Sequence, residues 1–248
     1  MLKIFIGYDS RQPLSYNVLQ HSIISKSSAP VSIAPLVIEQ LPIKRTGLTP
    51  FTYSRFLVPY LCDYKGWALF LDADIILNDD VANLFNLVDE NFSVMVSKNK
   101  IKFEWSSVIL FNCEKCTVLT PEFIETSENL HNMKWAHEIE IGELPAKWNH
   151  LVGYDAKPEE TPSLIHYTQG MPVYRQTETC DYSREWFIEQ HKTMHIAPWK
   201  ELMGDSVHAA EVNGVKVPRF LIDEESGLPA KGQEKKLMEL IKMNEVAQ

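Results

Sequence analysis

The sequence lacks any long apolar run. Across its 248 residues no such run approaches the ~18 residues that are needed to span a membrane. The N-terminal segment 1–8 enters a strand too soon to serve as a signal peptide. We therefore expect no transmembrane segment.

Basic residues are in the minority. The chain carries 24 lysines and arginines against 33 aspartates and glutamates, which gives a formal net charge of −9. A nucleic-acid-binding protein normally presents a basic face, and anionic membrane surfaces attract basic residues. We therefore expect neither nucleic acid nor an anionic membrane as a partner.

Cysteine is also scarce. Four cysteines in a chain of this length do not form a disulfide framework. Cys113 and Cys116 make one Cys-x-x-Cys, which is half of a zinc site, whereas Cys62 and Cys180 stand alone. We expect free thiols and a reducing, cytoplasmic location.

The most informative segment that is present spans residues 67–77. Asp72 and Asp74 interrupt an otherwise apolar run, and the five apolar residues before them predict a strand buried on both faces. A carboxylate is expensive to bury at the end of such a strand, and a divalent cation, which prefers oxygen ligands, would offset that cost. Open α/β sheets bind ligands at the carboxyl ends of their strands. The segment therefore predicts a metal site in a ligand crevice.

A simpler interpretation is that the two aspartates lie in a solvated turn and cap a helix that starts near Val81. Asn78, Asp79 and Asp80 lie closer to that helix and are better candidates for its cap. The metal site is therefore the preferred hypothesis.

Strands and helices alternate along the first part of the chain. Apolar runs predict strands at residues 3–7, 31–38, 66–71, 92–97 and 108–111, and helical spacing predicts helices at 13–26, 52–61 and 81–88. This alternation predicts an α/β fold with a mostly parallel central sheet and flanking helices.

The composition changes near Gly204. Residues 205–233 carry charges, three glycines and two prolines, as a linker does. We expect one domain over 1–203 and a C-terminal appendage over 204–248.

The appendage ends in a predicted amphipathic helix at 234–246. Its apolar residues Leu237, Leu240 and Ile241 lie on one face. This helix either docks back on the domain or belongs to a flexible arm that binds a partner, including a second copy of the chain in an oligomer.

The loop after the first strand has the composition of a nucleotide site. Gly7 allows a close approach of the backbone, Tyr8 can stack on a base, and Asp9 can accept a hydrogen bond from a ring N–H or a ribose hydroxyl, with Ser10 beside them. An ordinary turn between a strand and a helix would look the same.

Two single residues could complete a diphosphate and metal site. Arg55 lies on a largely apolar helix, where its planar guanidinium would suit diphosphate oxygens, although a surface arginine is the alternative. His166 follows two apolar residues, as at the end of a strand. It is either a structural histidine or, beside the Asp-x-Asp, a further metal ligand.

In this order, the motifs resemble those of the family 8 glycosyltransferases, which have the GT-A fold. The matching motifs are the N-terminal strand with its glycine-containing loop, a Tyr-x-Arg helix with Tyr53 and Arg55, the apolar strand into Asp-x-Asp, a Leu-Pro-x-x-Trp-Asn element at 144–149, and His166-Tyr167 followed by Gly170. The resemblance covers residues 3–172. It implies a GT-A domain over 1–203 with a C-terminal helical appendage.

In that family the two aspartates and the late histidine bind manganese, which holds the diphosphate of a nucleotide-sugar. The resemblance therefore implies that Asp72, Asp74 and His166 bind Mn²⁺ or Mg²⁺. It implies a retaining enzyme that transfers a hexose from a uridine-linked donor, such as UDP-glucose or UDP-galactose, to an unknown acceptor such as a glycan or a lipid-linked sugar. Arg55 and Glu138 would be catalytic. The donor-binding residues that it implies are Gly7, Tyr8, Asp9, Ser10, Tyr53, Arg55, Asp72, Ala73, Ser107 and Gly170.

The chain departs from the family pattern at three places. Gly170 lies four residues after His166 and is followed by Met-Pro-Val, and Ser107 lies in Trp-Ser-Ser-Val where the family has Asn-Ala-Gly-Val. The family's Asp-Gln pair is missing from the region of Glu138, and Glu138 and Glu140 are alternatively surface charges.

Two other functions stay open at the level of the sequence. A non-catalytic nucleotide-sugar-binding module would keep only the metal site. An aspartyl-nucleophile phosphatase also places Asp-x-Asp after an apolar strand.

Overall fold

The structure is a computed structural model that describes residues 1–248 except 129, 138–139, 194–208, 213, 224–225 and 247–248. The chain divides into two compact units, Met1–Thr193 and Met194–Gln248. The predicted boundary between residues 203 and 204 falls outside the described residues and stays a prediction. None of the helices in the described ranges is long and apolar enough to cross a bilayer.

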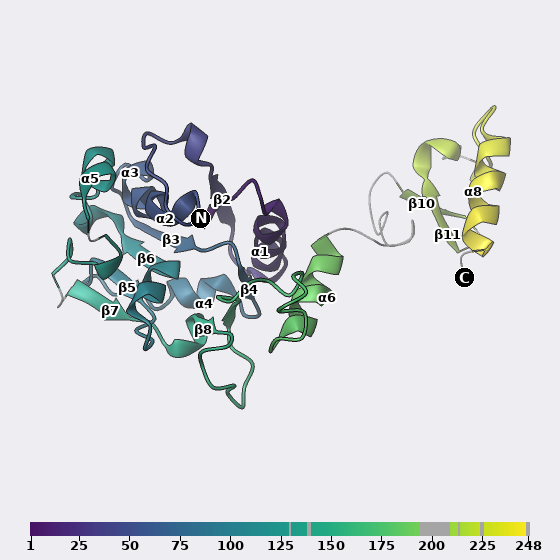
Figure 1. The fold of residues 1–248 in the computed structure, drawn as a ribbon. Helices are drawn as coiled ribbons and strands as arrows, with labels where there is room; N and C mark the ends of the chain where they lie inside the picture. The colour runs from purple at the N-terminus through teal and green to yellow at the C-terminus, as the bar shows by residue number, and fades with distance from the viewer. Residues whose placement is uncertain (129, 138–139, 194–208, 213, 224–225, 247–248) are drawn as a thin grey trace. The chain divides into compact units, whose positions relative to one another are not determined.

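The first unit is built on a six-stranded sheet with the strand order β2-β1-β3-β6-β5-β7 (Figure 1). Within this sheet only β6 runs against the direction of the other strands. The predicted mostly parallel sheet is therefore confirmed. The strands are β1 (Leu2–Gly7), β2 (Val31–Leu36), β3 (Trp67–Leu71), β5 (Val94–Val96), β6 (Val108–Asn112) and β7 (Ile141–Glu143).

The core lies around the two central strands. The side chains of Leu69 and Phe70 in β3, and of Ile109 and Leu110 in β6, are completely buried on both faces of the sheet. Burial of such a side chain contributes about 1.5–3 kcal/mol. A strand of this kind tolerates a charged residue only where it ends, which is where Asp72 stands.

A second sheet continues directly from the aspartates. It has the order β4-β9-β8, with β4 (Ile75–Leu77), β8 (His150–Leu151) and β9 (Leu164–His166). Strands β4 and β9 are antiparallel, and Ile75 pairs with His166. This register brings Asp74 beside His166, which lies far away in the sequence.

Most of the predicted elements are present, with several boundaries shifted. The first helix and the last have the predicted bounds, whereas β2, β5 and the helix from Val81 are shorter than predicted. Pro35 lies in β2, which pairs only with β1 at the edge of the sheet, where a missing N–H is tolerated. The helices of the first unit are α1 (Pro13–Lys26), α2 (Phe51–Ser54), α3 (Val58–Leu61), α4 (Val81–Phe85), α5 (Pro121–Thr126) and α6 (Ser183–Thr193). In the described part of the chain, the 3₁₀ turns are Ile38–Gln40, Arg55–Leu57, Lys102–Ser107, Cys113–Lys115, Leu130–Asn132, Ala146–Trp148 and Arg219–Leu221.

The predicted single helix over 52–61 is wrong in detail, because it is split into α2, a 3₁₀ turn at Arg55–Leu57 and α3. Pro59 has no N–H and cannot donate to the carbonyl of Arg55, so the regular α pattern is interrupted there. The turn carries Arg55 into the interior of the first unit.

Helix α4 begins where the capping argument expected it. The Asp80 carboxylate accepts a hydrogen bond from the backbone N–H of Ala82 at 2.9 Å and caps the helix. The alternative in which Asp72 and Asp74 cap this helix is therefore wrong.

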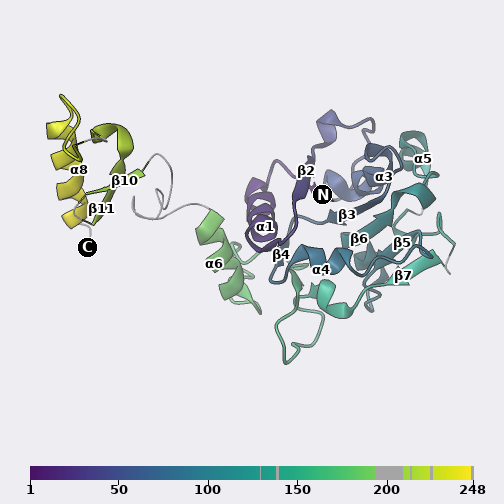
Figure 2. The same cartoon turned by 180° about the vertical axis from the view of Figure 1, so that it is seen from behind.

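Helices α1 and α6 lie side by side, as both views show (Figure 2). Val18 of α1 and Trp186 of α6 belong to one buried apolar cluster. Beside it, the carboxylate of Glu189 contacts His21 and lies 3.0 Å from Lys26 Nζ. The contact is therefore part apolar and part ionic.

The second unit contains a hairpin of β10 (Ala209–Val212) and β11 (Val215–Pro218) and the helix α8 (Glu234–Val246). The hairpin was not predicted, although the sequence Val-Asn-Gly-Val at 212–215 is typical of a tight hairpin turn. Leu237 and Ile241 of α8 pack with Val217 and Leu221. The apolar face of α8 is therefore covered inside its own unit, and the predicted oligomer contact would have to use another face.

Candidate active site

The sheet topology gathers the predicted site at one edge. Strands β1 and β3 are parallel neighbours, with Ile6 opposite Leu71, so the loop after Gly7 and the Asp-x-Asp leave the sheet at the same end. Strand β6 runs the other way and starts there, with Val108 opposite Leu71. This edge is where open α/β sheets bind ligands.

Asp72, Asp74 and His166 form an acidic centre at this edge. One ligand atom from each lies within 4.8 Å of the others. His166 is 2% exposed, and its Nε2 lies 3.3 Å from Asp74 Oδ1. The structure therefore assembles the three residues that were predicted as metal ligands.

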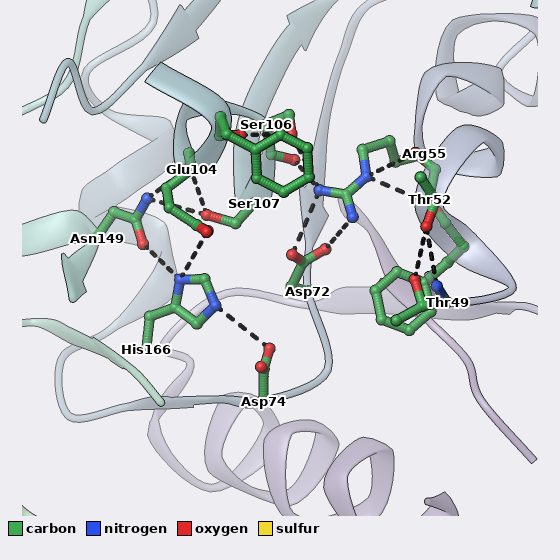
Figure 3. A network of polar contacts seen from close by, with 12 residues as sticks. Thr49, Thr52, Arg55, Asp72, Asp74, Glu104, Ser106, Ser107, Asn149 and His166 are labelled. Atoms are coloured by element: carbon green, nitrogen blue, oxygen red, sulfur yellow. Dashed lines mark hydrogen bonds and ion pairs between the residues drawn. The ribbon is translucent and has the colours of Figure 1, made fainter. Parts of the chain in front are cut away.

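The other side of the His166 ring is held by a separate set of polar groups (Figure 3). Its Nδ1 lies 3.2 Å from Asn149 Oδ1 and 4.0 Å from Glu104 Oε2. Asn149 Nδ2 donates to Ser107 Oγ at 3.1 Å. Burial by itself would lower the pKa of His166, but Asp74, Asp72 and Glu104 raise it above its usual value.

Arg55 lies against Asp72 instead of at the surface. Its side chain is 5% exposed, its Nη2 lies 3.0 Å from Asp72 Oδ1, and its Nη1 donates to the Ser106 carbonyl at 2.7 Å. The alternative of a surface arginine is therefore wrong. The contact of Arg55 with a diphosphate stays a prediction.

The carboxylate of Asp72 is incompletely compensated. Burial raises its pKa to about 7, Arg55 lowers it, and Asp74 raises it further. Its Oδ1 is buried and, at 3.0 Å from Arg55, has no hydrogen bond with suitable geometry. A buried oxygen without a hydrogen bond, beside a second carboxylate and an imidazole, is a donor set that fits a divalent cation.

The acidic centre borders a cavity of about 130 Å³, which we call the metal cavity. Glu104 and Thr168 line it, as do Thr52 and Phe103, and none of these was predicted. No local pattern singles them out: Glu104 lies in a 3₁₀ turn among polar and aromatic residues, where acidic side chains are ordinarily solvated.

The glycine-containing loop packs differently from its predicted role. A Cβ on Gly7 would lie 2.5 Å from the Phe51 ring, so the close approach that it permits is to a protein side chain. Tyr8 packs edge-on against Tyr16, with ring centroids 5.7 Å apart. Whether this loop also binds the donor stays a prediction.

Asp9 already has a partner in this loop. Arg11 Nη2 donates to Asp9 Oδ2 at 2.6 Å, and this hydrogen bond lowers the pKa of the Asp9 carboxyl. Ser10 is exposed. A donor would have to share the Asp9 carboxylate with Arg11.

The remaining predicted donor residues do not line the metal cavity. The Tyr53 ring lies under the Arg45 guanidinium at 3.7 Å. Ala73 is buried, and Gly170 adopts a φ of +114°, a conformation that favours glycine. Glu138 lies outside the described residues, so its predicted catalytic role stays a prediction.

Solved structures with a similar fold identify the class. The structure of WbbM, a bifunctional glycosyltransferase, matches with a TM-score of 0.60 and 15% identity over 82% of this chain. This chain covers 51% of the matched WbbM chain. LgtC, a galactosyltransferase solved with donor and acceptor sugar analogues, matches with a TM-score of 0.56 and 11% identity, over 81% of this chain and 99% of LgtC. The fold is that of the GT-A glycosyltransferases.

Sequence comparison then identifies the family. The model of "Glycosyl transferase family 8" matches residues 10–137. Protein CDI of Arabidopsis thaliana is 34% identical over 225 residues, covering 77% of this chain and 86% of that protein. The chain belongs to glycosyl transferase family 8, so it is a glycosyltransferase and the phosphatase alternative is set aside.

Proposed function

We propose that this glycosyltransferase transfers a hexose from a uridine diphosphate sugar to an acceptor, with retention of the anomeric configuration and with a divalent metal ion. The observation that carries this proposal is the acidic centre of Asp72, Asp74 and His166, with ligand atoms within 4.8 Å of one another. UDP-glucose and UDP-galactose are the first donors to test, and the site of action would be the cytoplasm.

The three side chains of the acidic centre would hold the ion. Two carboxylate oxygens and an imidazole nitrogen suit Mn²⁺, whereas Mg²⁺ uses imidazole less often. The ion, when bound, would neutralise charge on the diphosphate as the sugar leaves. Asn149 would position His166, because it contacts Nδ1 and leaves Nε2 facing Asp74.

Arg55 would act on the donor diphosphate from its position beside Asp72. Its guanidinium orients Asp72 and lines the metal cavity, so it is placed to donate to oxygens that gain negative charge in the transition state. The sugar becomes oxocarbenium-like as its bond to phosphate breaks. We favour attack by the acceptor on the same face of the sugar, within an ion pair, which gives retention.

The nucleotide would lie toward the β1 side of the acidic centre. The loop from Gly7 to Ser10 leaves the sheet at the same edge as Asp72, because β1 and β3 are parallel neighbours. Tyr8 and Asp9 would then recognise the base and the ribose.

A thermal-shift screen tests the proposal directly. The purified chain is heated with UDP, UDP-glucose and UDP-galactose, each with Mn²⁺, with Mg²⁺ or with a chelator. A ligand at 100 times its Kd should stabilise the protein by about 2.7 kcal/mol. We expect this shift with UDP and Mn²⁺ and its loss in the chelator.

Two outcomes separate the proposal from its alternative. Release of UDP from a bound donor, with a product of retained configuration by NMR, supports the transferase. Metal-dependent binding without turnover, across a broad set of acceptors, would instead indicate a non-catalytic nucleotide-sugar-binding module. Absence of any metal-dependent nucleotide binding contradicts both.

A further inference from the structure

A second cavity adjoins the active site. Its volume is about 480 Å³, against about 130 Å³ for the metal cavity. Small-molecule sites usually measure about 300–1,000 Å³, so only the larger cavity has room for a sugar. Lys98, Lys100 and Lys147 line it, and we call it the lysine-lined cavity.

The lysine-lined cavity lies at the same sheet edge, on the side away from β1. Lys98 and Lys100 follow the end of β5, which is separated from β3 by β6 in the strand order. Asn149 joins the two cavities, because it lines the larger one and also contacts His166. With the nucleotide on the β1 side, a ligand here would approach the acidic centre from the other side.

Three lysines bring positive charge to the lysine-lined cavity. Neither Lys98 nor Lys100 forms an ion pair with any described residue, while Lys147 lies 3.8 Å from Asp79. Of the two carboxylates that line the cavity, Asp155 accepts a hydrogen bond from the Leu151 N–H at 2.8 Å, and Glu160 is exposed. The two unpaired ammonium groups of Lys98 and Lys100 therefore favour an anionic ligand, in a chain whose net charge is −9.

We propose that the lysine-lined cavity is the acceptor subsite and that it selects a sugar carrying an anionic group, either a carboxylate or a phosphate. Lys98 and Lys100 bind the anionic group of this sugar. The inference rests on the proposed transferase function, because it names the acceptor class for that reaction.

Binding of three small sugars to the full chain tests the charge selection. Glucose 6-phosphate, glucuronate and glucose are titrated separately, in the presence of UDP and Mn²⁺, and their Kd values are measured by NMR. We expect both anionic sugars to bind about tenfold more tightly than glucose. A preference for only one of them identifies the group as phosphate or as carboxylate. Equal affinities for all three, or no binding of either anionic sugar, would overturn the proposal.

Two variants locate the selection. The double variant Lys98→Glu with Lys100→Glu should abolish the tenfold preference. Lys115→Glu makes the same kind of charge change at an exposed position outside the cavity and should alter nothing. A preference that survives the double variant places the anionic sugar elsewhere and contradicts the proposal.

UDP affinity distinguishes this proposal from the proposed function. Mn²⁺-dependent UDP binding should be unchanged in the double variant, because its lysines lie outside the metal cavity. If UDP binding falls there, the lysines serve the donor diphosphate and the acceptor assignment is wrong. If the wild-type chain itself fails to bind UDP with Mn²⁺, the proposed function fails on its own.

Discussion

Two buried carboxylates in this molecule, Glu189 and Asp72, differ in how far nearby cations compensate their charge. Glu189 of α6 contacts His21 and Lys26 of α1, and although burial raises its pKa, these partners bring it below the usual value. Asp72 has Arg55 as its ion-pair partner among the described residues. Arg55 and His166 lower the pKa of Asp72, but burial together with Asp74 raises it to about 7.

The difference lies in the local charge balance. Glu189 has two basic partners, so the protein alone satisfies it, and its role is to join two helices. Asp72 shares one arginine while Asp74 and Glu104 add charge of its own sign. A buried acid that the protein leaves undercompensated is where an external cation gains most. This charge balance therefore supports the proposal that the acidic centre binds a cation, whereas Glu189 joins α1 to α6.

The largest expected effect comes from removing Arg55, the ion-pair partner of Asp72. Arg55→Ala should destabilise the metal-free protein by about 3–5 kcal/mol, because it leaves a buried carboxylate without its partner. Arg55→Lys should recover only part of this loss, since the fork of donors is gone. Denaturant unfolding above pH 7 measures both, with Arg184→Ala on the exposed face of α6 as the control. Equal stability of Arg55→Ala and the control would refute this account of Asp72.

The next largest effect is expected from replacing Asp74, the second carboxylate of the acidic centre. Asp74→Asn should weaken Mn²⁺-dependent UDP binding by about 100-fold or more, because a charged metal ligand is lost. The fold should stay intact or gain stability, since a like charge beside Asp72 is removed. Calorimetric titration of UDP with Mn²⁺ measures the loss. Asp63→Asn, at an exposed loop position, should bind as wild type does, and an unaffected Asp74→Asn would mean that the metal lies elsewhere.

His166 distinguishes the kind of ion. His166→Ala should weaken UDP binding with Mn²⁺ by about tenfold and with Mg²⁺ by less, because imidazole is a better ligand for transition metals. Parallel titrations with the two ions measure the preference. A lower melting temperature with an unaltered metal preference would make His166 a structural residue.

The smallest expected effect comes from replacing Glu189, whose carboxylate has two basic partners. Glu189→Gln should destabilise the first unit by about 1 kcal/mol at neutral pH, since its partners His21 and Lys26 are only half-buried. The folded-state pKa of Glu189 is lowered from 4.5, so its contribution is present above pH 4.5 and is lost as the pH falls through the folded value. The wild type and Glu189→Gln should therefore converge in stability as the pH falls below 4.5. Glu114→Gln, at an exposed site, should follow the wild type throughout, and a pH-independent difference for Glu189→Gln would argue against the ion pairs.

Local patterns determined a large part of the fold. Helix α1 begins at Pro13, because proline is well placed in the first turn of a helix, and its predicted bounds agree with the structure. The apolar run before Asp72 specified a strand that is buried on both faces, since a sequence of that kind is stable only inside a sheet. These signals lie within a few residues of one another, so they can be recognised in the sequence alone.

Other features of the site depend on distant contacts, which no local pattern shows. The sequence could not show that Arg55 is buried, because that depends on Asp72 and on the carbonyl of Ser106. It could not show that the small size of Gly7 accommodates the Phe51 ring. It also contained no signal for Glu104, whose position at the metal cavity follows from the start of β6 at the same sheet edge.

The sequence by itself therefore determined the family, the Asp-x-Asp strand and the candidate ligands, because each rests on a short, ordered pattern. Only the tertiary structure decided that His166 meets Asp74, through the antiparallel register of β4 and β9. It alone placed Lys98 and Lys100 at a cavity that Asn149 joins to the acidic centre. The physical reason is that strand register and burial depend on hydrogen bonds and packing between segments far apart in the chain, which no local pattern encodes.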